Sequence, residues 1–111
     1  MQLISGNFPD FIKRFQTAIL PNGEQLHILA GSGGQVGFIR TCKGDKIPLH
    51  QHQDSWTILI SGEMSMTVGD KVFTASNGDN WLVSEGIMHG GEALQDSLIV
   101  EVFSEQRYSV D

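Results

Sequence analysis

The sequence predicts an all-β fold. Three observations support this prediction: thirteen glycines are scattered along the chain, there are only three prolines, and short β-branched runs alternate with turn residues. The turn signals recur about every 8 to 12 residues, a spacing typical of a sandwich or a closed barrel. A chain of 111 residues has the size of one domain, so we expect residues 1–111 to share a single core.

The turn signals separate seven candidate strands. Turn residues occupy positions 21–23, 31–34, 43–45, 69–70, 77–79 and 89–91. The strands predicted between them span 24–30, 35–42, 56–60, 63–68, 71–75, 80–83 and 97–104. In strand 63–68, Met64 and Met66 alternate with polar residues, so both should face the core.

Only the segment 10–20 has helical periodicity. Its apolar residues fall near one helical face, at Phe11, Ile12, Phe15 and Ile19. Asp10 can cap the first turn of such a helix. The same residues fit equally well an N-terminal arm that packs on the barrel or on a second subunit. We therefore expect a short helix or an arm before the first strand.

Composition excludes two classes of partner. The formal net charge is −6, and the seven Lys and Arg residues are not clustered, so there is no basic stripe for nucleic acid or anionic lipid. No apolar run approaches the ~20 residues that span a bilayer. Cys42 is the only cysteine, and the opening residues lack the order of a signal peptide. We expect a cytoplasmic protein with no membrane or nucleic-acid partner.

Two closely spaced histidines are the first candidate site residues. His50 and His52 lie two residues apart, so on an extended chain their side chains point to the same face. Two ligands of one metal ion need this arrangement. The spacing alone also fits a surface pair or a pair stacked in the core.

The surroundings of this pair resemble the first motif of the cupin family. That motif runs Gly, five residues, His-x-His, a short gap, Glu or Gln, six residues, Gly. This chain has the corresponding glycines and histidines over residues 44–62, at Gly44, His50, His52 and Gly62.

The second cupin motif is matched over residues 78–89. It runs Gly, five residues, Pro, x, Gly, two residues, His, and this chain has Gly78, Gly86 and His89 in place, with Ser84 for the proline. The resemblance implies a small jelly-roll barrel of the RmlC-like type over the whole chain. It also implies a divalent metal, such as Zn, Ni, Mn or Fe, bound by His50, His52 and His89 in the mouth of the barrel.

The first motif departs from the family at its fourth ligand. Counted back from Gly62, the Glu or Gln position holds Ser55, and counted forward from His52 with the usual gap of three it holds Trp56. Neither is a normal ligand, and the nearest carboxylate is Asp54. Three interpretations follow: two histidines with Asp54 and His89, three histidines with water, or a barrel that has lost its metal. Three imidazoles on one face are sufficient for Zn, Fe, Ni or Cu.

The C-terminal part resembles the pectin-degradation cupins that act on unsaturated uronates. Their pattern D-x-F-x-x-x-R is matched by Glu101, Phe103 and Arg107, with Glu for Asp. The resemblance implies that Arg107 clamps a substrate carboxylate, that Glu101 moves a proton and that Phe103 shapes the pocket. The alternative is that Phe103 belongs to the core and the two charges are solvated. Met88, beside His89, is a further candidate for lining the cavity.

Three functions are compatible with these residues. The first is a metal-dependent isomerase or ring-opening enzyme that acts on a small sugar acid, with the metal as a Lewis acid. The second is a non-catalytic cupin that binds a small molecule. The third is a three-histidine iron dioxygenase. We also expect a homodimer, because the apolar residues near the N-terminus and the sheet edges of so small a barrel need covering.

Overall fold

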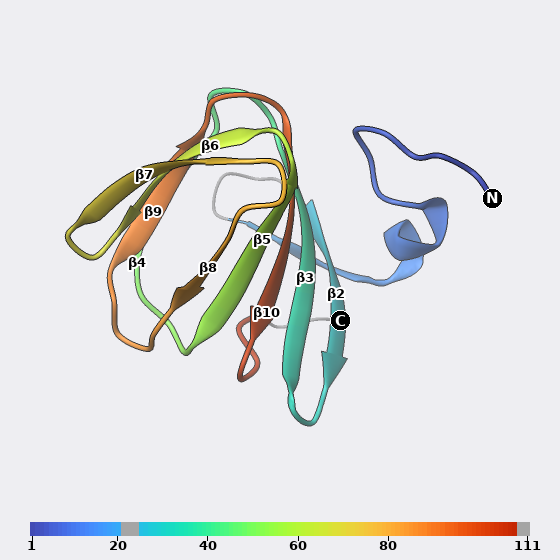
Figure 1. The fold of residues 1–111 in the computed structure, drawn as a ribbon. Coiled ribbons are helices and arrows are strands. Elements are labelled where there is room, and N and C mark those ends of the chain that lie inside the picture. The colour runs from blue at the N-terminus through green and yellow to red at the C-terminus, as the bar shows by residue number, and fades with distance from the viewer. Residues whose placement is uncertain (21–24, 109–111) are drawn as a thin grey trace.

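Two antiparallel β-sheets form the body of the protein. The computed structural model describes residues 1–20 and 25–108. The larger sheet has the strand order β1-β2-β3-β10-β5-β8 and the smaller sheet has the order β4-β9-β6-β7 (Figure 1). The strands are β1 Gln16–Ile19, β2 Gln25–Gly31, β3 Gly34–Thr41, β4 Lys46–His50, β5 Ser55–Ser61, β6 Glu63–Val68, β7 Lys71–Ser76, β8 Asn80–Val83, β9 His89–Ala93 and β10 Ser97–Phe103. This is the all-β jelly roll that the sequence predicts.

All seven predicted strands are present, with ends that shift by one residue or less in the described part of the chain. The predicted turn at 21–23 and the predicted strand start at residue 24 lie outside the described residues. Three strands were not predicted: β1, β4 and β9. Two of these, β4 and β9, carry histidines of the candidate site.

The N-terminal segment is an arm rather than a regular helix. A short 3-10 helix spans Asp10–Arg14 and the chain then enters β1, so the longer helix over 10–20 is wrong. Ile12 is buried, while Phe8 and Phe15 pack edge-on and tilted against Phe38 of β3, with ring centroids 5.7 and 5.8 Å away. Contact between aromatic rings therefore holds the arm beside the larger sheet (Figure 1). No helix among the described residues is long and apolar enough to cross a membrane.

The core lies between the two sheets. It is built from alternate residues of the strands, because successive side chains of a strand point to opposite faces. Its buried members are Leu26, Ile28, Ile39, Leu59, Met64, Met66, Ala75 and Ile99. The predicted inward orientation of Met64 and Met66 is confirmed.

Two glycines that suggested a turn belong instead to the middle of the smaller sheet. Gly90 and Gly91 follow His89 in β9, which pairs with β4 on one side and β6 on the other. A Cβ atom at Gly90 would lie 2.6 Å from the carbonyl oxygen of Ile47, and one at Gly91 would lie 2.6 Å from the sulfur of Met66. The predicted turn at 89–91 is therefore wrong: these glycines permit close packing rather than chain reversal.

Candidate metal centre

Two strands and a loop position the three candidate ligand histidines. His50 ends β4, His52 follows in the connection to β5, and His89 begins β9. The pairing of β4 with β9 sets His50 opposite His89. Between Ile47 and His50 the register shifts, because three steps along β4 match two along β9. This β-bulge lets Ile47 and His50 line the same cavity in spite of their odd spacing.

The three imidazoles form one cluster. One ring nitrogen from each of His50, His52 and His89 lies within 4.8 Å of the others. The ring centroids are 5.1 Å apart for His50 and His52, 4.2 Å for His50 and His89, and 4.6 Å for His52 and His89. The two motifs, far apart in sequence, thus contribute to a single three-histidine site.

Backbone carbonyl groups fix the orientation of each ring. The Nδ1 atoms of His50, His52 and His89 lie 2.8, 2.8 and 2.9 Å from the carbonyl oxygens of Pro48, Gln53 and Ile87, respectively. A carbonyl oxygen only accepts hydrogen bonds, so Nδ1 is the donor in each ring. In the neutral imidazole Nε2 then carries the free lone pair, as in metal-binding histidines whose other nitrogen donates to a carbonyl group.

The donor set fits a cation. The Nε2 atoms of His52 and His89 lie 3.0 Å apart, and with both Nδ1 protons committed their lone pairs face one another. Burial lowers the pKa of both rings below the ordinary 6.5, although the carbonyl hydrogen bonds act in the opposite direction. Neutral rings with facing lone pairs repel unless a positive ion lies between them. A divalent metal meets this requirement, and His50 completes a three-nitrogen set.

The Asp54 carboxylate lies outside this set. Its Oδ1 accepts a hydrogen bond of 2.6 Å from the backbone N–H of Glu85, in the turn of the second motif. Ser55, at the position of the family's fourth ligand, is buried. Among the described residues, the metal-ligating group contains the three histidines and no carboxylate. Of the three interpretations drawn from the sequence, the structure favours three histidines over a set that includes Asp54.

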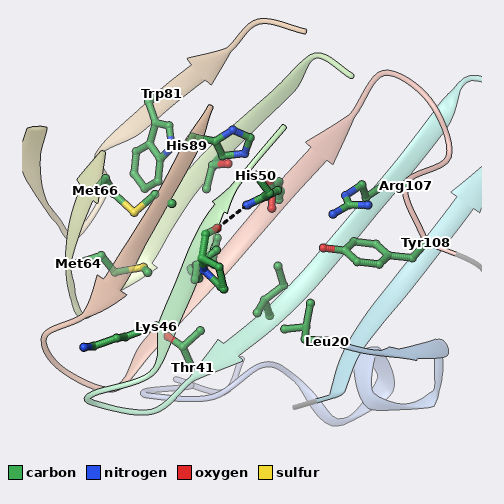
Figure 2. Close-up of a pocket in the computed structure, with 17 residues that line it drawn as sticks. Leu20, Thr41, Lys46, His50, Met64, Met66, Trp81, His89, Arg107 and Tyr108 are labelled. Carbon is green, nitrogen blue, oxygen red and sulfur yellow. Dashed lines mark hydrogen bonds between the residues drawn. The ribbon is translucent and has the colours of Figure 1, made fainter. Parts of the chain in front are cut away.

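The cluster opens into a cavity of about 180 Å³ between the sheets. His50 and His89 line it, together with Glu101 of β10 and with Arg107 and Tyr108, which follow β10. Figure 2 shows Arg107 and Tyr108 on one side of the cavity, with the two histidines between them and Trp81. The structure therefore brings Glu101 and Arg107 to the same cavity as the histidines.

Glu101 is the acidic group of the cavity. Burial raises the pKa of Glu101 to about 7, against the opposing effects of the Ser55 and Thr57 hydroxyl groups and the Arg107 charge. A carboxyl group with a pKa near neutrality can both accept and return a proton at pH 7. Among the described residues that line this cavity, Glu101 is the only carboxylic acid.

Gln35 and Tyr108, which sequence reasoning missed, hold Arg107 in place. The Gln35 Oε1 accepts hydrogen bonds from the backbone N–H groups of Arg107 and Tyr108, at 2.8 and 2.9 Å, and its Nε2 donates to the Tyr108 carbonyl at 2.7 Å. The Arg107 guanidinium lies over the Tyr108 ring, 5.1 Å from its centroid, and its buried Nε has no hydrogen-bond partner among the residues that the structure describes. The sequence signal for Gln35 was its place in the alternation of β3, where it is a polar residue in phase with Gly37 and Ile39.

The other two candidate residues lie elsewhere. Phe103 is 1% exposed and does not line the cavity; it packs behind the site, with ring centroids 5.4 Å from His52 and 5.7 Å from Tyr108. Met88 is 44% exposed and is also not part of the lining. Phe103 thus supports the rings that border the site, and Met88 faces solvent.

The two sheets and the histidine cluster define a small cupin fold of the RmlC-like type. Solved structures with this fold include KdgF from Halomonas sp., with a TM-score of 0.75 and 24% identity, covering 86% of this chain and 90% of that chain. An RmlC-like cupin from Shewanella frigidimarina has a TM-score of 0.76 and 18% identity, covering 86% and 87%. Oxalate decarboxylase from Bacillus subtilis has a TM-score of 0.75 and 20% identity, covering 88% of this chain and 29% of that one. No family model and no curated protein sequence matches the chain.

Proposed function

We propose that this protein is a divalent-metal cupin that binds a small carboxylate and catalyses its isomerisation or ring opening by proton transfer. One observation carries the proposal: three imidazoles converge with each Nδ1 held by a carbonyl group, next to a cavity that contains a carboxyl group and a guanidinium. The fold shared with KdgF, together with the resemblance of Glu101, Phe103 and Arg107 to the pattern of the pectin-degradation cupins, makes a sugar acid the first carboxylate to test.

The histidines, Arg107, Glu101 and Tyr108 each have a role in such a reaction. A metal bound by the three histidines supplies a Lewis acid that polarises a substrate oxygen. The Nε of Arg107, which has no partner within residues 1–20 and 25–108, donates to the substrate carboxylate, which also neutralises the charge of the guanidinium. Glu101 removes a proton from the substrate carbon and returns it to a neighbouring atom. Burial raises the pKa of Tyr108 to about 12, so its hydroxyl group remains a hydrogen-bond donor.

The metal part is tested by elemental analysis of protein purified without an affinity tag. We expect about one equivalent of Zn, Ni or Mn, and we expect His50→Ala, His52→Ala and His89→Ala each to weaken metal binding by more than about 100-fold. His27→Ala is the matched control, because His27 lies in β2 outside the cluster. Stoichiometric Fe would favour the iron dioxygenase, and absence of any metal would favour the non-catalytic binder. Full occupancy in the His89→Ala variant would contradict the ligand set.

The catalytic part is tested with the metal-loaded protein in D₂O. Sugar acids, unsaturated uronates among them, are incubated with the protein and followed by proton NMR. We expect deuterium to enter a carbon position of one substrate as it isomerises, because Glu101 exchanges its proton with solvent. The Glu101→Gln variant should lose this exchange while it keeps the metal. Turnover without deuterium entry in the parent protein would contradict proton transfer through Glu101.

A further inference from the structure

We infer that the ligand of the cavity is amphiphilic, with a carboxylate head near Arg107 and the histidines and an apolar body of a few carbons against Met66 and Trp81. The inference rests on the proposed carboxylate and metal site, and it narrows the class of ligand that this site takes. It follows from how polar and apolar side chains are distributed around the cavity.

Arg107 and Tyr108 form the polar end of the cavity. The other cation of the lining, Lys46, lies near Met64, but its side chain is 77% exposed and its ammonium group pairs with Glu92 rather than with the cavity (Figure 2). Arg107 and Tyr108 face the cavity from the segment after β10, and His50 and His89 lie between them and Trp81 (Figure 2). The Arg107 guanidinium and the three imidazoles together provide a head-group site for an anion with a second, metal-binding oxygen. A 2-oxo or 2-hydroxy carboxylate has these two features.

The opposite side is a wall of carbon and sulfur. Figure 2 shows Met64, Met66 and Trp81 across the cavity from Arg107. Phe73 holds the Trp81 ring in place, with an edge-to-face contact at a centroid distance of 5.5 Å. Ile47 adds to the apolar lining, Leu20 lies on the side of Tyr108 (Figure 2), and most of the cavity surface belongs to apolar atoms. Such a wall favours methylene or aryl groups over hydroxyl groups.

The apolar part offers few hydrogen bonds to a polyhydroxylated ligand. Two buried polar atoms on the cavity lining lack a partner among the described residues, the Nε of Arg107 and the hydroxyl group of Thr41. The Thr41 hydroxyl can satisfy one ligand oxygen. A sugar acid carries a hydroxyl group on nearly every carbon, and each one buried without a partner weakens binding by about tenfold.

Three carboxylates of graded chemistry test the inference in the metal-loaded protein by isothermal titration calorimetry. Pyruvate has the head group alone, 2-oxohexanoate adds three carbons, and galacturonate has six carbons with hydroxyl groups. Each buried methylene increases affinity by about fourfold. We expect 2-oxohexanoate to bind at least about tenfold more tightly than both pyruvate and galacturonate.

Two methionine variants locate the tail. Met66→Gln, which places a polar amide in the wall, should remove most of the advantage of 2-oxohexanoate and leave pyruvate affinity unchanged. Met88→Gln is the matched control, because Met88 is exposed and outside the lining, and it should change neither affinity. Met66→Leu, an apolar replacement, should still bind 2-oxohexanoate more tightly than pyruvate. This variant shows whether the loss of 2-oxohexanoate affinity in Met66→Gln results from the polarity of the amide or from misfolding.

The outcomes separate the inference from the proposed function. If pyruvate binds and 2-oxohexanoate binds no more tightly, the head-group site stands and the amphiphilic ligand is wrong. If galacturonate binds as tightly as 2-oxohexanoate or more tightly, the inference is likewise overturned while the proposed sugar-acid chemistry gains support. If none of the three binds to metal-loaded protein, both the carboxylate site and the inference fail.

Discussion

Short-range hydrogen bonds orient the imidazoles of this site. His50 and His89 each place Nδ1 on the carbonyl oxygen two residues earlier, and His52 uses the carbonyl group of the next residue. Because these partners are local, the rings are oriented by the backbone that carries them. The nitrogens should therefore converge before an ion arrives, which reduces the reorganisation that metal binding requires.

The Glu101→Gln substitution should change how stability depends on pH. Burial raises the pKa of Glu101 in the folded protein from 4.5 to about 7. The folded state then binds the proton more tightly than the unfolded state. Protonation of Glu101 therefore stabilises the folded protein fully below pH 4.5, and this stabilisation is lost as the pH rises towards 7. Each pKa unit corresponds to about 1.4 kcal/mol.

In metal-free protein we expect Glu101→Gln to be about 3 kcal/mol more stable than the parent at pH 8, and within about 1 kcal/mol of it at pH 5. Urea unfolding of both proteins at the two pH values measures the difference, and the titration of the histidines cancels between them. A stability difference that does not change with pH would show that Glu101 ionises as an ordinary surface carboxyl group.

Asp54 gives a second test at the scale of one residue. Because its carboxylate accepts a hydrogen bond from the Glu85 N–H, Asp54→Ala should lower stability by about 1 kcal/mol without changing metal affinity. Asp54→Asn retains an acceptor oxygen and should cost less. Thermal unfolding and metal titration of the two variants measure these effects. A loss of metal affinity comparable to that of a histidine variant would place Asp54 among the ligands after all.

At the scale of elements, the bulge in β4 and the glycines of β9 bring the two motifs together. Pro48, which cannot donate to a sheet ladder, lies within the bulge, a position that proline tolerates. Gly90 lets the backbone of β4 approach β9 closely. These two features explain how β4, a short strand with proline and lysine, can pair with β9, a strand with two glycines. The pair carries His50 and His89.

The same features explain which elements sequence reasoning could find. Strands with clear alternation, such as β6, were predicted with correct ends. The histidines were found because their spacing resembles two cupin motifs. Strands β4 and β9 were missed because proline and paired glycines are turn signals in isolation, and only the packing of neighbouring strands makes them suitable here. Gln35 and Tyr108 lie 73 residues apart, and no local pattern reveals their contact.

Gly90→Ala should therefore damage the site from outside it. The added Cβ would lie 2.6 Å from the Ile47 carbonyl oxygen and 3.1 Å from the Leu49 nitrogen, so β4 must move and carry His50 with it. We expect metal affinity to fall at least about tenfold and stability to fall by about 1–3 kcal/mol. Gly33→Ala is the control, because nothing lies within 4 Å of a Cβ atom there. Unchanged metal affinity in Gly90→Ala would mean that the bulge does not set the position of His50.

At the scale of the whole molecule, the outer face of the larger sheet carries an apolar row. Leu29, Val36, Val102, Trp56 and Leu82 form one row in register across five strands. Strands lie about 4.8 Å apart, so the row is about 19 Å long. It contains no charged side chain, in a protein whose net charge is −6. We propose that a second copy of the chain covers this face in a two-fold dimer, because like charges do not oppose its approach here.

Sedimentation velocity at tens of micromolar tests the dimer. We expect twice the mass of the 12.2 kDa chain. Leu82→Lys should shift the protein to the monomer, because it places a charge in the apolar row. Val72→Lys, at an equally exposed position of β7 in the other sheet, should leave the dimer intact. A monomeric parent protein would contradict the proposed dimer. If only Val72→Lys loses the dimer, the interface lies on the smaller sheet instead.

The short distance between His52 and His89 has a consequence for unfolding. The two residues are 37 positions apart in the chain, and an ion that holds both closes a loop of that length. By the measure used for covalent cross-links, such a closure removes about 4 kcal/mol of conformational freedom from the unfolded chain. Removal of the metal by a chelator should therefore lower the stability of this barrel, as reduction lowers the stability of a disulfide-bonded domain, because it breaks a cross-link. The chain has a single cysteine and therefore cannot form an internal disulfide bond, so the metal would provide the cross-link instead.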